Sequence, residues 1–166
     1  MTPQSKRPPS PGPAALDAPG VIAPPPLIYL FFLMAGLALE ALLPSASIPG
    51  VVRWAVGAAL LVAGFVLARA FVAAFNRAGT AFDPRRPTTA IVTSGPYRLT
   101  RNPGYLGFTL VYAGIAVLAG ALWPFATLVP ALVLVDRAVI AREERYLERK
   151  FGEEYARYKR RVRRWL

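Results

Sequence analysis

Long apolar runs separated by short polar stretches constrain this chain more than any other feature of its sequence. A membrane-spanning helix takes about 20 apolar residues, with about 17 as the lower limit. Runs of this kind lie at residues 27–43, 51–75, 104–121 and 123–141. The pattern predicts an all-α fold, a polytopic membrane helical bundle of about four transmembrane helices.

The overall composition also favours a membrane protein. Hydrophobic residues make up 55% of the 166 residues, and charged residues make up only 17%. A chain of this length cannot bury so much apolar surface in a core of its own. The lipid bilayer is therefore the expected main partner, and a water-soluble bundle with unusually apolar helices is the alternative.

The residue types that are absent exclude several kinds of chemistry. The sequence has no cysteine and no histidine. Disulfides, thiolate metal sites and cysteine nucleophiles are therefore excluded, and so are zinc chemistry and Ser-His triads. No metal site is expected.

The basic residues predict how the bundle lies in the membrane. The two hairpin turns, at residues 44–50 and 120–124, contain no Lys or Arg, whereas eleven of the twenty basic residues lie between Arg137 and the C-terminus. Basic segments stay on the cytoplasmic side of a membrane. Both termini and the central loop should therefore face the cytoplasm, and the Ala-, Arg- and Pro-rich composition indicates a bacterial inner membrane.

Two segments flank the predicted spans, and together the spans and the second segment form one domain over residues 27–166. Residues 1–26 hold nine of the seventeen prolines, which is typical of a disordered Pro-rich tail. Residues 142–165 carry apolar side chains at spacings of three and four. This spacing predicts one basic amphipathic cytoplasmic helix along the membrane interface, with Gly152 as its weak point.

Nucleic acid would also suit a net charge of +11, but the membrane tether favours a lipid surface, and no nucleic-acid partner is expected.

The central polar loop carries signals for a helix start and for an anion. Asn102 and Pro103 are typical of a helix start, with Asn as the cap and Pro at the first helical position. The backbone N–H groups and the positive end of the helix dipole would then lie beside Arg98 and Arg101. These groups suit an anion such as a carboxylate. The alternative is that both arginines only anchor the loop at the membrane surface.

Two adjacent carboxylates follow the last apolar run. Glu143 lies four residues before Leu147, so it shares the apolar stripe that packs inward, and Glu144 is expected to point about 100° away. A carboxylate on a packed face near a membrane boundary is costly without a partner. That partner is either a neighbouring arginine or a ligand that carries a cation or hydroxyls, and the sequence leaves both open.

Four segments in this order resemble motifs of the isoprenylcysteine carboxyl methyltransferase family and its phospholipid methyltransferase relatives. They are residues 92–98 (VTSGPYR), 100–107 (TRNPGYLG), 143–144 (EE) and 151–155 (FGEEY). The resemblance covers the second half of the chain. It implies a small polytopic membrane enzyme that binds S-adenosylmethionine at the cytoplasmic face and methylates a lipophilic acceptor.

The resemblance also implies a set of site residues. The cofactor would lie against Thr89, Ala90, Ile91, Val92, Tyr97, Asn102, Pro103, Gly104, Tyr105 and Glu143. Arg101 would orient an anionic acceptor, and the ring of Tyr105 would face the sulfonium. A carboxylate or thiolate acceptor needs no general base, so alignment and exclusion of water supply the rate. For an amine or alcohol acceptor, Glu144 or a tyrosine would take the proton.

Two positions depart from the family pattern. Asn102 stands where the eukaryotic carboxyl methyltransferases have histidine, and Val139 stands where the family has an arginine that contacts the acceptor. The expected function is methylation of a small lipophilic carboxylate or thiol, with a phospholipid amine as a third acceptor. The alternatives are a relative of the NADPH-dependent sterol reductases and a non-catalytic membrane scaffold.

Overall fold

The computed structural model describes residues 24–46, 48–79 and 89–166, and every regular element in these ranges is helical. The elements are α1 (Pro25–Leu42), α2 (Gly50–Ala78), the 3-10 turn η2 (Gly95–Arg98), α3 (Pro103–Ala119), α4 (Trp123–Leu134), the π-helical segment η3 (Val135–Ile140), α5 (Ala141–Phe151) and α6 (Glu153–Arg161). The predicted all-α fold is confirmed. Residues 1–23 of the predicted tail and residues 80–88 of the central loop lie outside the described residues.

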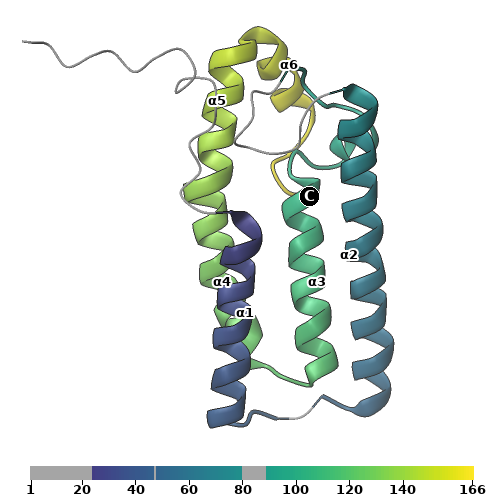
Figure 1. Ribbon diagram of the computed structural model, residues 1–166, viewed down its shortest axis with the longest axis vertical. Coiled ribbons are helices and arrows are strands. Elements are labelled where there is room, and N and C mark those ends of the chain that lie inside the picture. Colours follow the sequence, from purple (N-terminus) through teal and green to yellow (C-terminus); the bar gives the residue numbers. More distant parts are fainter. Residues whose placement is uncertain (1–23, 47, 80–88) are drawn as a thin grey trace, which may run out of the picture.

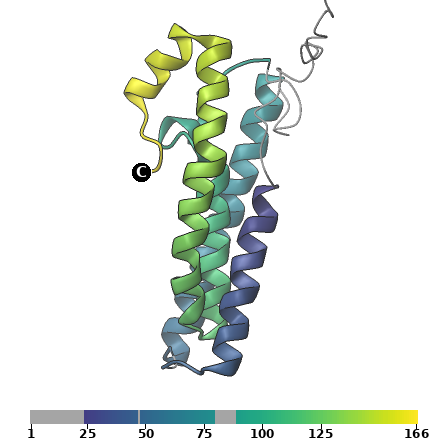
Figure 2. The same ribbon diagram turned by 90° about the vertical axis from the view of Figure 1, so that its left-hand side faces the viewer.

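The long helices form two hairpins that run the length of the molecule. Both hairpins turn at one end of the bundle, between α1 and α2 and between α3 and α4, and the loop before α3, α5 and α6 lie at the other end (Figure 1). Helix α2 packs mainly on α3, and α1 packs mainly on α4. Helix α4, η3 and α5 form one continuous rod that rises beyond α1 toward α6 (Figure 2).

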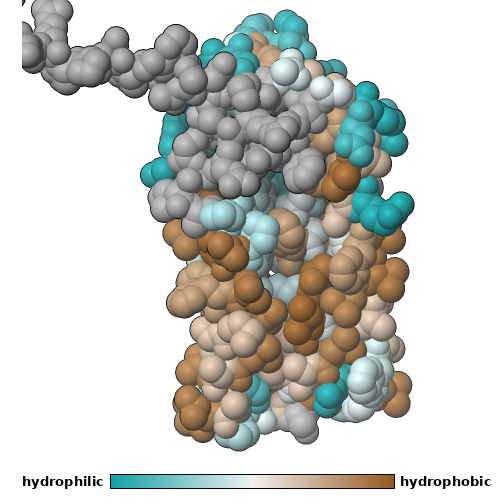
Figure 3. Space-filling model, viewed as in Figure 1, coloured by the Kyte–Doolittle hydropathy of each residue, from teal (hydrophilic) through white to brown (hydrophobic). Residues whose placement is uncertain are grey.

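The helices suit a lipid environment. Three of them, Pro25–Leu42, Gly50–Ala78 and Trp123–Phe151, are long and apolar enough to cross a membrane, and Pro103–Ala119 is a shorter apolar helix. Large apolar side chains such as Phe31 point outward from the bundle. Apolar residues cover the middle and lower parts of the molecule, and hydrophilic residues gather at the end that holds α6 (Figure 3). The protein is a helical membrane bundle.

Small residues allow α2 and α3 to approach closely. A Cβ atom on Gly64 would lie 3.0 Å from the Gly107 carbonyl oxygen and 2.7 Å from a methyl carbon of Val111. Glycine at such contacts lets two helix backbones pack directly, as is common within membranes. The contact fixes α3 against α2 and thereby places the first turn of α3.

The C-terminal segment differs from the single helix expected over residues 142–165. Helix α5 ends at Phe151, and Gly152 takes φ 51° and ψ −123°, a conformation that side chains with a Cβ rarely adopt. Helix α6 folds back over the bundle, with Tyr155 and Tyr158 buried against it. The chain becomes extended at Val162. The helix breaks at the predicted weak point, Gly152, and two residues of the predicted apolar stripe, Tyr155 and Tyr158, pack against protein.

Candidate active site

A tyrosine and a carboxylate meet where α3 begins and α5 begins. The Tyr105 hydroxyl donates a hydrogen bond of 2.7 Å to Glu143 Oε1. Tyr97, from η2, interacts electrostatically with Glu143, and its ring packs against Phe71 and Phe75 of α2. Burial and the negative charge of Glu143 raise the pKa of Tyr97 well above its usual range, so its hydroxyl stays protonated. These residues form a cluster that combines aromatic rings with one carboxylate.

The neighbouring carboxylate, Glu144, joins a separate ionic cluster with Arg101, Arg164 and Asp136. Arg101 Nη2 lies 3.2 Å from Glu144 Oε1, and Arg164 Nη2 lies 2.5 Å from Glu144 Oε2. Arg164 Nη1 also lies 3.1 Å from Asp136 Oδ2. The hydrogen bond to Glu144 raises the pKa of the Arg164 guanidinium, so this group keeps its charge. Glu144 is only 5% exposed.

The π-helical segment η3 explains why both carboxylates reach Arg164. Asp136 and Glu144 are eight residues apart, and a regular helix of 3.6 residues a turn would separate their directions by about 80°. The wider turn of η3 lies between them and reduces this angle. Both side chains therefore face the same side of the rod. Glu144 follows Glu143 on the regular helix α5 and so points to a different side as expected, but that side is buried as well because the C-terminal residues cover it.

Residues 162–166, which we call the C-terminal strap, tie the central loop to this rod. The backbone carbonyl oxygen of Arg164 accepts hydrogen bonds from Asn102 Nδ2 at 2.8 Å and from Thr100 Oγ1 at 3.0 Å. Arg101 N donates to the Arg163 carbonyl oxygen at 2.9 Å. Trp165 Nε1 donates to Asp136 Oδ1 at 3.0 Å. The strap therefore holds three consecutive loop residues directly in front of α3.

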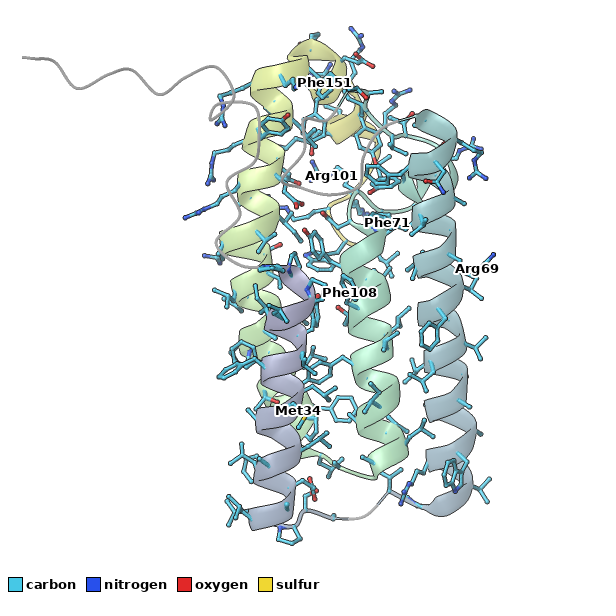
Figure 4. All side chains as sticks on the ribbon, viewed as in Figure 1. Met34, Arg69, Phe71, Arg101, Phe108 and Phe151 are labelled. Atoms are coloured by element: carbon cyan, nitrogen blue, oxygen red, sulfur yellow. The ribbon has the colours of Figure 1, made fainter. Side chains whose placement is uncertain are left out.

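Arg101 is the least satisfied member of the ionic cluster. Its side chain is 9% exposed, and its Nε and Nη1 donors are buried without a hydrogen-bond partner in the described part of the chain. A buried charged donor left unpaired costs more than an ordinary missing hydrogen bond. Arg101 lies between α5 and α3 inside this end of the bundle, whereas Arg69 points outward from α2 (Figure 4). Two guanidinium donors of Arg101 therefore remain unpaired among the described residues.

The structure brings five of the twelve residues that the sequence predicted for the site into two adjacent groups. Tyr97, Tyr105 and Glu143 form one group, and Arg101 and Glu144 form the adjacent one. The remaining predicted residues surround the start of α3 or precede η2: Thr89, Ala90, Ile91, Val92, Asn102, Pro103 and Gly104.

Two of the predicted site residues, Asn102 and Gly104, and the departing position Val139 behave in ways that sequence reasoning did not specify. Helix α3 starts at Pro103 as predicted, but Asn102 makes no side-chain cap and donates to the strap instead. A Cβ atom on Gly104 would lie 3.1 Å from the ring of Phe71, so glycine lets α3 pack closely on α2. Val139 is fully buried in the core, so its apolar side chain serves packing.

Sequence reasoning missed the strap and its partner Asp136. Trp165 fitted the apolar stripe of a helix, and Arg164 fitted its basic face. Asp136 directly follows an apolar run, and a carboxylate at such a position needs a partner. It was the one feature of the sequence that indicated a further contact here. The identity of that partner depends on a contact across 28 residues.

A groove opens beside the ionic cluster, between α3 and α4. Its volume is about 370 Å³, within the range of small-molecule sites. Its apolar part comes from α3 and α4, and its polar end comes from η3 and the strap: Leu106, Thr109, Leu132, Val133, Asp136, Arg137 and Trp165. The groove joins the apolar flank of the bundle to the charged residues.

Comparisons with known proteins assign this arrangement to a family. A family model described as phospholipid methyltransferase matches residues 52–154, which include α3, α5 and most of the site. The chain belongs to the phospholipid methyltransferase family. The match agrees with the resemblance to isoprenylcysteine carboxyl methyltransferases and their phospholipid methyltransferase relatives. No solved structure matches the chain.

Two curated proteins are similar to parts of this family member. An uncharacterized protein of Haemophilus influenzae is 40% identical over 62 residues, which are 37% of this chain and 98% of that protein. The cobalt-zinc-cadmium resistance protein CzcN of Cupriavidus metallidurans is 40% identical over 74 residues, which are 43% of this chain and 34% of CzcN. The chain therefore covers nearly all of the first relative and about a third of the second.

Family and fold together give the coarse function. The protein is a multi-pass membrane protein of a methyltransferase family. Among the described residues, no group of three or more acidic side chains lies close enough to hold a metal ion.

Proposed function

We propose that the protein is an integral membrane methyltransferase that uses S-adenosylmethionine and methylates a small lipophilic carboxylate or thiol at the cytoplasmic membrane face. The observation that carries the proposal is the pairing of two opposite binding features at the start of α3. One is the Tyr105–Glu143 hydrogen bond, and the other is Arg101 with two buried donors that have no partner among the described residues.

The Tyr105–Glu143 side suits the cofactor. Its ammonium group and hydroxyls are partners for the Glu143 carboxylate, and its sulfonium is a cation that favours the aromatic faces of Tyr97 and Tyr105. The segment Thr89 to Val92, together with Asn102, Pro103 and Gly104, completes the proposed cofactor surface. When bound, S-adenosylmethionine supplies a methyl group activated by a positive sulfur.

The Arg101 side suits the acceptor. An anionic oxygen or sulfur beside Arg101 would satisfy a buried donor that otherwise has none. The apolar part of the acceptor would lie in the groove between α3 and α4, which has aliphatic walls at Leu106 and Leu132. The acceptor would therefore enter from the apolar flank with its charged end toward Arg101.

The chain's own residues then align and shield the reacting groups. An acceptor that is already anionic needs no general base, so Arg101 has only to hold it in line. Glu144 fixes Arg101 and, because two arginines already bind it, we assign it this orienting role in preference to proton transfer. Burial at this end of the bundle excludes water from the displacement.

The basic end of the bundle, with α6 and the strap, would face the cytoplasm of a bacterial inner membrane. Arg157, Lys159 and Arg160 are exposed there, and basic segments stay on the cytoplasmic side. This orientation places the site where soluble S-adenosylmethionine is available.

The test is a titration of the detergent-purified protein with S-adenosylmethionine by isothermal calorimetry. The wild type should bind it, and Glu143→Gln and Tyr105→Ala should each weaken binding by about tenfold or more, because the first removes the charge that pairs with the ammonium group and the second removes the ring that faces the sulfonium. Glu148→Gln is the matched control. Glu148 lies on the same helix but pairs with Lys159 at the surface.

Three outcomes would count against the proposal. A wild type that binds NADPH but not S-adenosylmethionine would favour the reductase alternative, and one that binds neither would favour a scaffold. If both site variants bind as tightly as Glu148→Gln, the cofactor site is assigned to the wrong residues.

A further inference from the structure

We propose that Arg164 in the C-terminal strap is a positioning residue that keeps Arg101 available for a carboxylate. The identity of that carboxylate rests on the proposed function: it belongs to the methionine end of the cofactor or to the acceptor. Arg164 lies outside the matched residues 52–154, so the family match assigns it no role.

The contacts of Glu144 carry this proposal. Arg164 contacts both oxygens of the Glu144 carboxylate, with Nη2 at 2.5 Å from Oε2 and Nε at 3.3 Å from Oε1. Arg101 reaches only Oε1, through Nη2 at 3.2 Å. Two parallel hydrogen bonds between the carboxylate and the guanidinium are the favoured geometry for such a pair. Here Arg164 occupies that arrangement, whereas Arg101 reaches the carboxylate through Nη2 alone and also forms a side-chain hydrogen bond with Tyr155.

Removing the Arg164 side chain would change how Glu144 binds Arg101. The carboxylate would lose its closest cation and would turn toward the remaining one, because a buried charge without a partner is costly. A paired Glu144–Arg101 fork would occupy Nη2 and one adjacent donor of Arg101 and would neutralise its charge. The carboxylate ligand would then have to compete with Glu144 for the same edge.

A second pair of contacts keeps Arg164 itself in place. Its Nη1 lies 3.1 Å from Asp136 Oδ2, and Asp136 Oδ1 accepts a hydrogen bond from Trp165. The Arg164 backbone carbonyl binds Thr100 and Asn102 independently of its side chain. A change of the side chain therefore tests the positioning of Glu144 while the backbone contacts of the strap remain.

The experiment compares Arg164→Gln and Arg164→Lys with the matched control Arg161→Gln, which removes the same charge from an exposed position three residues away. Three probes are titrated by calorimetry: S-adenosylmethionine, 5′-methylthioadenosine, which lacks the amino-acid end, and dodecanoate. Arg164→Gln should lower the affinity for the carboxylate ligand by about tenfold relative to Arg161→Gln. Arg164→Lys should recover much of this loss, because it restores the charge. Binding of methylthioadenosine should stay within about twofold.

The probes separate the two sources of the carboxylate. A loss of affinity for S-adenosylmethionine alone assigns the carboxylate to the cofactor, and a loss of affinity for dodecanoate alone assigns it to the acceptor. Equal binding of all three probes by Arg164→Gln and Arg161→Gln would overturn the proposal. If the wild type binds dodecanoate but not S-adenosylmethionine, the proposed cofactor is wrong while the dodecanoate comparison still decides the role of Arg164.

Fluorescence of Trp165 distinguishes positioning from simple loss of the strap. The chain has three tryptophans, so Trp165 is the only one left when Trp54 and Trp123 are replaced by phenylalanine. In this background Arg164→Gln should keep the emission maximum and the acrylamide quenching of Arg161→Gln. A red shift together with weaker binding of all probes would show that the whole strap detaches, and the positioning role would be rejected.

Discussion

Two neighbouring carboxylates, Glu143 and Glu144, serve different partners because the α5 helix is covered on two sides. Glu143 faces α3 and accepts a hydrogen bond from a tyrosine, whereas Glu144 faces the central loop and the strap and binds two arginines. The first carboxylate keeps capacity to bind a cationic or hydroxyl-bearing ligand. The Glu144 carboxylate compensates the charge of Arg101 only in part, so the Arg101 guanidinium keeps donors near Glu143 that are unpaired among the described residues.

Arg101 is the residue whose replacement should most directly affect the acceptor. We expect Arg101→Gln to raise the KM for an anionic acceptor by about 10- to 100-fold, because it removes a charged hydrogen-bond donor from a buried position. Methyl transfer from radiolabelled S-adenosylmethionine in proteoliposomes measures the change.

Arg98→Gln is the matched control for this prediction, because Arg98 lies in the same loop with an exposed side chain. The KM of the Arg98→Gln variant for the anionic acceptor should remain within about twofold of the wild-type value. Equal effects of the two changes would show that only the positive charge of the loop matters, and that Arg101 makes no specific contact.

At the residue scale, the sequence could predict the groups that depend on local signals. The position of Pro103 predicted the start of α3, and the apolar stripe predicted the inward direction of Glu143. The burial of Glu144 was not predictable, because helical periodicity describes one packed face and this helix has two. The second face exists only because the strap returns to it.

At the scale of elements, the contact between α2 and α3 determines where the site can form. Gly64 and Gly107 place the two helix backbones in direct contact, and Phe71 of α2 covers Gly104 in the first turn of α3. A shift of α3 along α2 would therefore move Tyr105 relative to Glu143. The helix pair acts as the fixed support of the site.

Gly64→Leu should test this support. The added side chain would collide with Val111 and the Gly107 backbone, and overpacking of this kind costs about 1–3 kcal/mol. We expect a lower thermal unfolding temperature in detergent. Ala63→Leu, which places the same side chain on the exposed side of α2, is the control and should leave the temperature nearly unchanged. Equal destabilisation by both would contradict a specific α2–α3 contact.

The elements themselves were largely predictable, and their ends less so. Apolar run length and proline positions gave helices close to those observed, since both act locally along the chain. Gly152 marked a real break, but its positive φ reverses the chain and does not merely bend it. The extended strap was not predictable, because its carbonyls are bound by residues more than 60 positions earlier.

At the scale of the whole molecule, the two ends of the bundle differ in charge. The end with the hairpin turns exposes apolar residues such as Val51 and Trp54, and the other end carries α6, the strap and the site. This asymmetry is what a membrane protein with a fixed orientation requires. It also places the candidate active site at one end of the bundle.

Cysteine labelling tests the proposed orientation directly, because the chain has no cysteine of its own. In intact bacterial cells, with the outer membrane made permeable, a membrane-impermeant maleimide should label Ala46→Cys at the hairpin end. It should not label Glu154→Cys on α6 until the inner membrane is disrupted. Both positions are exposed, so access to the reagent decides the result. The reverse pattern would place the site on the periplasmic side.

The strap also has a consequence for biosynthesis. Asn102 meets its partner 62 residues later in the chain, and ribosomes add about 5–20 residues a second, so the loop in front of α3 waits about 3–12 seconds for it. During this interval the long helices already have the length and apolarity for insertion, while the loop lacks its backbone acceptors. A nascent chain stalled before Arg163 would therefore sit in the membrane without the contacts that the strap makes to residues 100–102.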